Sequence, residues 1–218
     1  MQRFPRAVVP LLLASLVTAC SSSSTRDPLC TRERDPLDLF CQAGLSGAGE
    51  GADQAREALP RAVTAGLVRI ESNPLGTLTV DGVDEVWVAT FFSASDDSVW
   101  QVTANALEGT ADATMLDAVT SCGAGDGMDS PDSRAVVPDA VRRFEVDHGL
   151  FQLGANNLFY RRRLPCASPT GALDHHVAFQ LGGATLERWY ARYDSGGHFV
   201  DLCGPCAEYA PAECAACP

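Results

Sequence analysis

The sequence has 218 residues, of which 46% are hydrophobic and 20% are charged, and its formal net charge is −12. This composition is ordinary for a globular protein, and the length suits one domain or two small ones. All 16 basic residues are arginine. The absence of lysine excludes P-loop nucleotide binding, pyridoxal enzymes and Schiff-base aldolases, which each need a lysine amine. The acidic excess disfavours nucleic acid as a partner, and we expect none.

The first 19 residues have the pattern of a secretory signal peptide. Arg3 and Arg6 lie in a short segment without acidic residues, and an apolar run over residues 7–17 follows them. That run is too short to cross a bilayer as a helix, which takes about 20 apolar residues. We therefore expect residues 1–19 to direct export and to be removed.

Val17-Thr18-Ala19-Cys20 resembles the lipobox of bacterial lipoproteins, in which an aliphatic residue and two small residues precede a cysteine. The resemblance implies that Cys20 takes a diacylglyceryl thioether after cleavage and that its new amine is acylated, for example with palmitate. Two or three acyl chains hold a protein firmly on a membrane. Ser21, rather than aspartate, after Cys20 implies an outer-membrane location in the cell envelope, facing the periplasm or the surface. Residues 20–29 would form the lipidated cysteine and a flexible tether.

Eight cysteines remain after Cys20, an even number that predicts disulfide bonds in an exported chain. They are Cys30, Cys41, Cys122, Cys166, Cys203, Cys206, Cys214 and Cys217. Eight cysteines permit 105 pairings, so their connectivity stays open. Spacing favours a short loop closed by Cys30 and Cys41, a bond between Cys122 and Cys166, and cross-links made by the Cys-rich tail, residues 203–218.

Two other interpretations compete for that tail. Cys203-Gly204-Pro205-Cys206 has the residues of the thioredoxin redox motif, but that motif works at the start of a helix with most of its domain downstream, and only residues 207–218 follow here. The two C-x-x-C pairs also offer four thiolates for zinc, although the segment between them is shorter than in a zinc ribbon. Structural disulfides are favoured, and we expect no metal and no cofactor.

Hydrophobic alternation and turn residues predict a mainly β protein, either sandwich-like or a curled antiparallel sheet with a short N-terminal helical segment, stapled by disulfides. We expect a single domain over residues 30–218 without an evident internal repeat. Helices are expected over residues 52–58 and 110–119. Strands are expected over residues 63–70, 77–81, 85–92, 99–107, 141–147, 150–153, 158–164, 175–181, 184–193 and 197–202. The strands over residues 85–92 and 99–107 should form a hairpin.

A candidate site lies in the last three predicted strands. If Gly182-Gly183 and Ser195-Gly196 form two-residue turns, His175 lies opposite Tyr190, and Asp201 lies beside Tyr190 on the core face. A histidine between a phenol and a carboxylate can act as a general base or a metal ligand. A histidine that is simply satisfied at the edge of the core is the favoured alternative. The same pairing places His176 and Trp189 on the outer face.

Three further features carry weaker predictions. Asp126, Asp129 and Asp132 could bind calcium, but they lack the spacing of an EF-hand loop and fit a solvated acidic loop better. The arginine run at residues 161–163 could bind an anion, but it is more typical of a solvated edge strand. Trp189, with Tyr193 and Tyr209 near it in sequence, could form an aromatic platform for a sugar or a peptide.

The sequence contains no Gly-x-Ser-x-Gly, Ser-x-x-Lys or His-Glu-x-x-His motif. We therefore expect a membrane-anchored lipoprotein with a non-catalytic binding or structural role at the cell envelope, and a protein or glycan as its ligand. The alternative is an envelope hydrolase or metal-dependent enzyme built on His175, Tyr190 and Asp201. A minor alternative is a thiol redox protein that uses Cys203 and Cys206.

Overall fold

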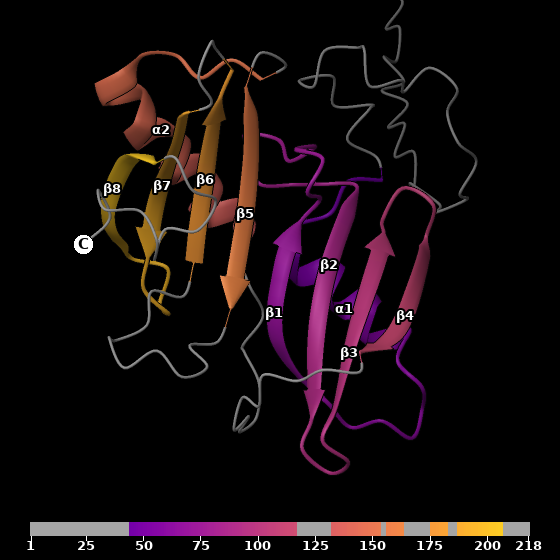
Figure 1. Cartoon of the computed structure of the whole chain (residues 1–218). Helices are drawn as coiled ribbons and strands as arrows, with labels where there is room; N and C mark the ends of the chain where they lie inside the picture. Colours follow the sequence, from indigo (N-terminus) through magenta and orange to yellow (C-terminus); the bar gives the residue numbers. More distant parts are fainter. Residues whose placement is uncertain (1–43, 117–131, 154–155, 164–174, 183–186, 207–218) are drawn as a thin grey trace, which may run out of the picture.

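The computed structural model describes residues 44–116, 132–153, 156–163, 175–182 and 187–206. Its elements in chain order are α1 (Ala48–Glu57), β1 (Gly66–Ser72), β2 (Val86–Ser93), β3 (Ser98–Asn105), β4 (Thr110–Leu116), α2 (Ser133–His148), β5 (Asn157–Arg163), β6 (His175–Leu181), β7 (Glu187–Tyr193) and β8 (Phe199–Cys206). The eight strands form one antiparallel sheet in the order β4-β3-β2-β1-β5-β6-β7-β8 (Figure 1). The prediction of a mainly β protein is therefore confirmed.

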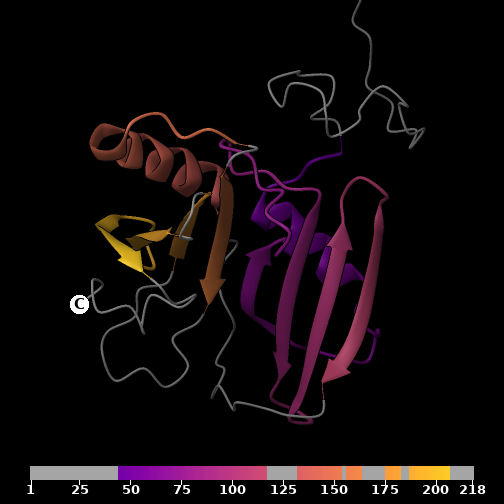
Figure 2. The same cartoon turned by 45° about the horizontal axis from the view of Figure 1, so that its top comes forward.

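The sheet is covered on one face by helices and not by a second sheet. Buried residues of α1, of α2 and of the strands beneath them belong to one hydrophobic core, so both helices lie on the same side (Figures 1 and 2). The described ranges contain no second sheet, and the helices take the place that it would have in a sandwich. The opposite face of the sheet is called the open face below, because no described helix or strand packs on it.

The element order repeats, although the sequence showed no internal repeat. In the described ranges, each half contains one helix followed by four strands in a meander. Residues 58–65 join α1 to β1, and residues 149–156 join α2 to β5 over the same length. The two halves meet where β1 pairs antiparallel with β5 through Arg69↔Arg163, Ile70↔Arg162 and Glu71↔Arg161. We call this β1–β5 pairing the seam.

Helix α1 packs closely on the sheet because the side chains that face it are small. Ala48, Gly51, Ala52 and Ala55 are its buried residues. The ring of Trp87 on β2 lies against them, and a Cβ atom at Gly51 would come within 2.4 Å of that ring. The indole N–H donates to the Ser46 carbonyl at 2.9 Å. The glycine is therefore required by the close approach of the helix to the indole.

Helix α2 occupies residues for which a strand over 141–147 was predicted, and that prediction is wrong. Its buried positions Val136, Val137, Ala140, Val141 and Phe144 follow helical spacing. The carboxylate of Asp132 caps its first turn by accepting from the Ala135 amide at 3.0 Å. Phe144 stacks on Phe179 of β6, with ring centroids 4.4 Å apart. Burial of this apolar stripe outweighs the hydrogen bond lost at Pro138.

Strands β7 and β8 are held to α2 by a polar contact at the rim of the core. The hydroxyl of Tyr193 on β7 donates to the Asp139 carboxylate at 3.0 Å. Arg142 and Arg143, one turn further along the helix, also bind this carboxylate at 2.6 and 2.7 Å. The guanidinium of Arg143 lies over the ring of Phe199 on β8. Asp139 therefore links the helix to the last two strands.

Other predictions of strands and helices have mixed outcomes. The hairpin predicted from residues 85–92 and 99–107 is confirmed as β2 and β3, which pair from Val86↔Asn105 to Ser93↔Ser98. The helix predicted over residues 110–119 is wrong, because residues 110–116 form β4. Residues 77–81 and 150–153 form no named strand. The alternation of small and polar residues in β4 fits the pleat of the sheet better than a helix face.

The connection between β1 and β2 is organised by one buried carboxylate. Asp84 has no exposed surface and accepts hydrogen bonds from the Asn73 amide at 3.1 Å and the Glu85 amide at 2.7 Å. It also accepts a short hydrogen bond from the Thr77 hydroxyl. Burial raises the pKa of Asp84 to about 6, against the lowering effect of these hydrogen bonds. The loop is therefore ordered around a group whose charge is costly to bury.

Candidate functional site

The open face of the C-terminal half carries a row of charged side chains that crosses five strands. Strand register places Glu71, Arg161, His176, Arg192 and Asp201 side by side, from β1 through β5, β6 and β7 to β8. Alternation along each strand keeps these residues off the helix-covered face. The row runs acid, arginine, histidine, arginine, acid, so its centre is a histidine between two guanidinium groups.

Each arginine of the row is bound by the acid at its outer side. Arg161 donates to Glu71 at 2.8 Å across the seam, and Glu71 also binds Arg69 on its own strand at 2.6 Å. Arg192 forms a short two-point contact with Asp201. Planar guanidinium groups suit such paired contacts with carboxylates. These pairs fix the orientation of both arginines on the open face.

His176 is buried at the centre of the row, with 7% of its surface exposed. Burial first, and then the nearby charges of Arg163, Arg161 and Arg192, together lower its pKa to about 4. The imidazole is therefore neutral at pH 7, with one nitrogen as a donor and the other as an acceptor. No hydrogen bond to its ring is found among the described residues.

A cavity lies beside this row. The next register row contains Phe159 on β5, Ala178 on β6 and Tyr190 on β7. Ala178 is small and lies between two aromatic residues, which leaves a cavity of about 430 Å³. Its lining comprises Glu71, Ser72, Pro74, Phe159, Tyr160, Arg161, His176, Ala178 and Tyr190. The cavity thus has apolar walls and a polar end.

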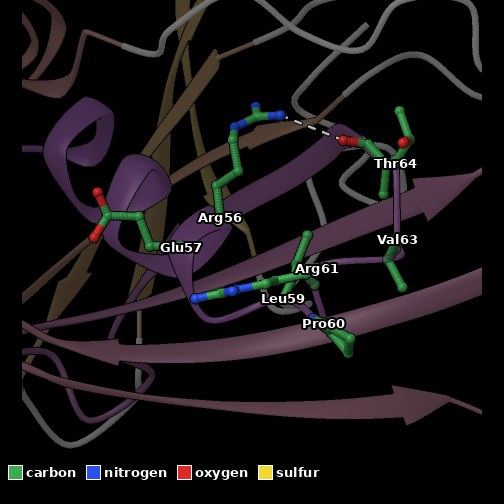
Figure 3. Close-up of a pocket in the computed structure, with 8 residues that line it drawn as sticks. Arg56, Glu57, Leu59, Pro60, Arg61, Val63 and Thr64 are labelled. Atoms are coloured by element: carbon green, nitrogen blue, oxygen red, sulfur yellow. Dashed lines mark hydrogen bonds between the residues drawn. The ribbon is translucent and has the colours of Figure 1, made fainter.

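A second hollow of about 370 Å³ lies at the end of α1, but it is a less suitable site. It is lined by the segment from Arg56 to Ala65, which turns from α1 into β1 (Figure 3). Arg56 is engaged there, because it donates to the Ala65 carbonyl at 3.3 Å and lies over the ring of Phe91. Since one continuous loop forms nearly the whole lining, we place the candidate site in the open-face cavity.

The predicted row of His175, Tyr190 and Asp201 does not form. His175 pairs with Tyr193, and Tyr190 pairs with Ala178, because residues 182–186 connect β6 to β7 in place of a two-residue turn. The pairing is shifted by an odd number of residues, which turns the side chains of β7 to the other face. Tyr190 and Asp201 lie on the open face, whereas His175 faces the helices.

His175 has a structural environment on the core side. It is buried, and its Nδ1 atom lies 2.9 Å from the hydroxyl of Tyr160. Burial lowers its pKa to about 4, and the charge of Arg162 contributes. The shifted pairing also places Trp189 against the ring of His148 of α2, with centroids 4.1 Å apart. Trp189 and Tyr193 therefore pack in the core and form no outer platform.

The prediction that the arginine run lies in an edge strand is wrong. Residues 161–163 belong to β5, which lies at the centre of the sheet between β1 and β6. Arg161 therefore points to the open face, where the seam brings it to Glu71.

Asp132 acts as the cap of α2, and Asp126, Asp129 and Tyr209 lie outside the described residues.

The Cys203-Gly204-Pro205-Cys206 segment lies within β8 and not at the start of a helix. Cys203 and Cys206 are both disulfide-bonded. The other cysteines named above, Cys20, Cys30, Cys41, Cys122, Cys166, Cys214 and Cys217, lie outside the described residues, so the pairing stays a prediction. Among the described residues, no group of histidine, cysteine and acidic side chains is arranged to hold a metal ion.

Comparisons with known proteins add no relative. No family model, no curated protein and no solved structure matches the chain. The function must therefore be argued from the geometry of the open face.

Proposed function

We propose that the protein is a non-catalytic binding protein of the cell envelope, which takes a small ligand in the open-face cavity. The observation that carries the proposal is the cavity of about 430 Å³ formed between Phe159 and Tyr190 over Ala178. Ligand cavities commonly have volumes of about 300–1,000 Å³, with apolar walls and a few polar groups that orient the ligand. The open-face cavity has both properties.

The side chains around the cavity support binding more than catalysis. Glu71 is held by ion pairs with two arginines, and His176 is enclosed by guanidinium groups that resist its protonation. A general acid or base works best when its pKa lies near the working pH. A clamped carboxylate beside a neutral, buried histidine suits the orientation of a ligand better than proton transfer.

Anchoring of this module to the membrane through Cys20 is part of the proposal. It is supported by the lipobox-like residues 17–20 and the serine-rich segment after them. Neither described helix is long and apolar enough to cross a membrane. Labelling of cells with radioactive palmitate should mark the wild type and not a Cys20→Ala variant. Equal labelling of both would contradict lipidation at Cys20.

Filling the cavity tests the binding function. Ala178→Phe adds a ring between Phe159 and Tyr190, while Thr103→Phe adds the same ring to an exposed position of the open face on β3. Both variants, made as the mature chain with Cys20→Ala, would be screened with the wild type against small organic ligands by protein-observed NMR. Ligands that bind the wild type should bind the Thr103→Phe variant equally well and should not bind the Ala178→Phe variant. Equal binding to all three proteins would refute the proposed site.

A further inference from the structure

We propose that the cavity selects a carboxylate attached to a flat ring, with the carboxylate at the Arg161 and His176 end and the ring between Phe159 and Tyr190. This inference rests on the proposed function and names the chemistry of its ligand. Three features of the described residues support it: the charge of the open face, the donors at the polar end of the cavity and the spacing of its aromatic walls.

The first feature is a local reversal of charge. The protein has a formal net charge of −12. The open face of β1 and β5–β8 nevertheless carries more arginines than acids among its described residues. The arginines are Arg69, Arg161, Arg163, Arg188 and Arg192, and the acids are Glu71 and Asp201. Five arginines against two acids among the described residues of this face favour an anion over a cation.

The second feature is the group of donors at the polar end. Arg161 lines the cavity with 26% of its side chain exposed. A guanidinium offers five N–H donors in a planar arrangement that matches a carboxylate. The neutral imidazole of His176 beside it can donate one N–H. The negative charge of Glu71 at this end is compensated by its contacts with Arg69 and Arg161.

The third feature is the distance between the aromatic walls. Phe159 and Tyr190 lie in one register row with Ala178 between them, so they are two strands apart. Adjacent strands are about 4.8 Å apart, which places these two backbones roughly 10 Å from each other. A flat ring in contact with an aromatic wall on each side needs about 7 Å, at about 3.5 Å per contact. The spacing of the two strands therefore leaves room for a flat ring between these side chains.

The test compares an acid with its uncharged amide. 3-Phenylpropionate and 3-phenylpropionamide share a ring and a shape, and each would be titrated at low salt into the mature chain carrying Cys20→Ala. The acid should bind at least tenfold more tightly than the amide. Arg161→Gln should remove that preference, while Arg142→Gln should keep it. Arg142 is the control for the loss of one positive charge, because it is an exposed residue of α2 and does not line the cavity.

The outcomes separate the ligand chemistry from the binding function. If the acid and the amide bind equally and both are lost in Ala178→Phe, the cavity binds ligands but the carboxylate inference is overturned. If neither binds the wild type, the carboxylate inference is also overturned, and the screen described above decides the binding function. Unchanged acid preference in a folded Arg161→Gln variant would overturn the role of Arg161.

The carboxylate can belong to a small acid or to the end of a polypeptide. The tripeptide Gly-Gly-Phe carries the same ring next to a peptide C-terminus, so it distinguishes the two sources. Affinity equal to or greater than that of 3-phenylpropionate would assign the cavity to a polypeptide terminus. Affinity at least tenfold weaker would assign it to a small aromatic acid. Either result supports the inference, provided that the acid is preferred over the amide.

Discussion

The buried carboxylate of Asp84 makes the stability of the protein depend on pH in an unusual direction. Its pKa is about 6 in the folded protein, compared with an ordinary value of 3.8. The folded state therefore binds the proton more tightly than the unfolded state, and protonation of Asp84 stabilises the fold. A shift of this size corresponds to about 3 kcal/mol in total. This contribution is fully present below pH 3.8 and is lost as the pH rises through 6.

Replacement by asparagine isolates this contribution from those of the other titrating groups. Asp84→Asn has the shape of the protonated acid and no charge at any pH. The free energy of unfolding of the wild type, minus that of Asp84→Asn, should increase by about 2 kcal/mol when the pH is lowered from 7.5 to 4.5. Chemical denaturation followed by tryptophan fluorescence at a series of pH values gives both terms.

Asp81→Asn provides the matched control, because Asp81 is an exposed residue in the same loop. Its profile gives the baseline for loss of a carboxylate from this loop, and the increase at low pH should be larger for Asp84→Asn. A flat profile for Asp84→Asn, or a difference that falls as the pH is lowered, would refute the argument that burial outweighs the hydrogen bonds to Asp84.

The remaining predictions concern three buried residues. Tyr193→Phe removes the hydrogen bond to Asp139 and should lower the free energy of unfolding by about 1 kcal/mol, since the arginines still satisfy the carboxylate; an unchanged denaturation midpoint would contradict this. Gly51→Val forces a side chain into the ring of Trp87 and should cost about 1–3 kcal/mol of stability, seen as a lower melting temperature; an unchanged melting temperature would contradict the close approach of α1 to the indole. His176 has a pKa of about 4, so its NMR resonances should not change between pH 5.5 and 8; a midpoint near 6.5 would show that the ring is not buried as described. Because the unfolded chain takes up this proton near 6.5, His176→Gln should also lessen the loss of stability on acidification through that range.

Much of the sheet could be predicted from local pattern. The residues of β2 and β3 are rich in β-branched and aromatic side chains, and a polar turn joins them, so their hairpin follows from the sequence. Helix α2 could also have been found, because Asp132 and Gly149 flank an apolar stripe with helical spacing. The helix was not predicted because a proline such as Pro138 ends many helices. Packing of Phe144 and its neighbours on the sheet outweighs the unfavourable effect of this proline on the helix.

The candidate site was harder to predict, because it depends on the register between strands. Gly182-Gly183 is typical of a tight turn, but the connection between β6 and β7 is longer. That difference moves Tyr190 from the core to the open face, where it faces Phe159 across Ala178. The residues now assigned to the site, Arg161 and His176, do lie on one face of their strands by alternation alone. Only the antiparallel pairing of β5 with β6 places them side by side.

Because the cavity lies at the seam, a ligand bound in it would contact both halves of the molecule and hold them together. Glu71 and Pro74 line the cavity from the first half, and Phe159, Arg161 and Tyr190 line it from the second. Among the described residues, the ladder across the seam is shorter than the ladders within either half. A bound ligand would therefore slow the opening of this ladder, and amide hydrogen exchange at the seam should report occupancy more directly than exchange at the outer strands.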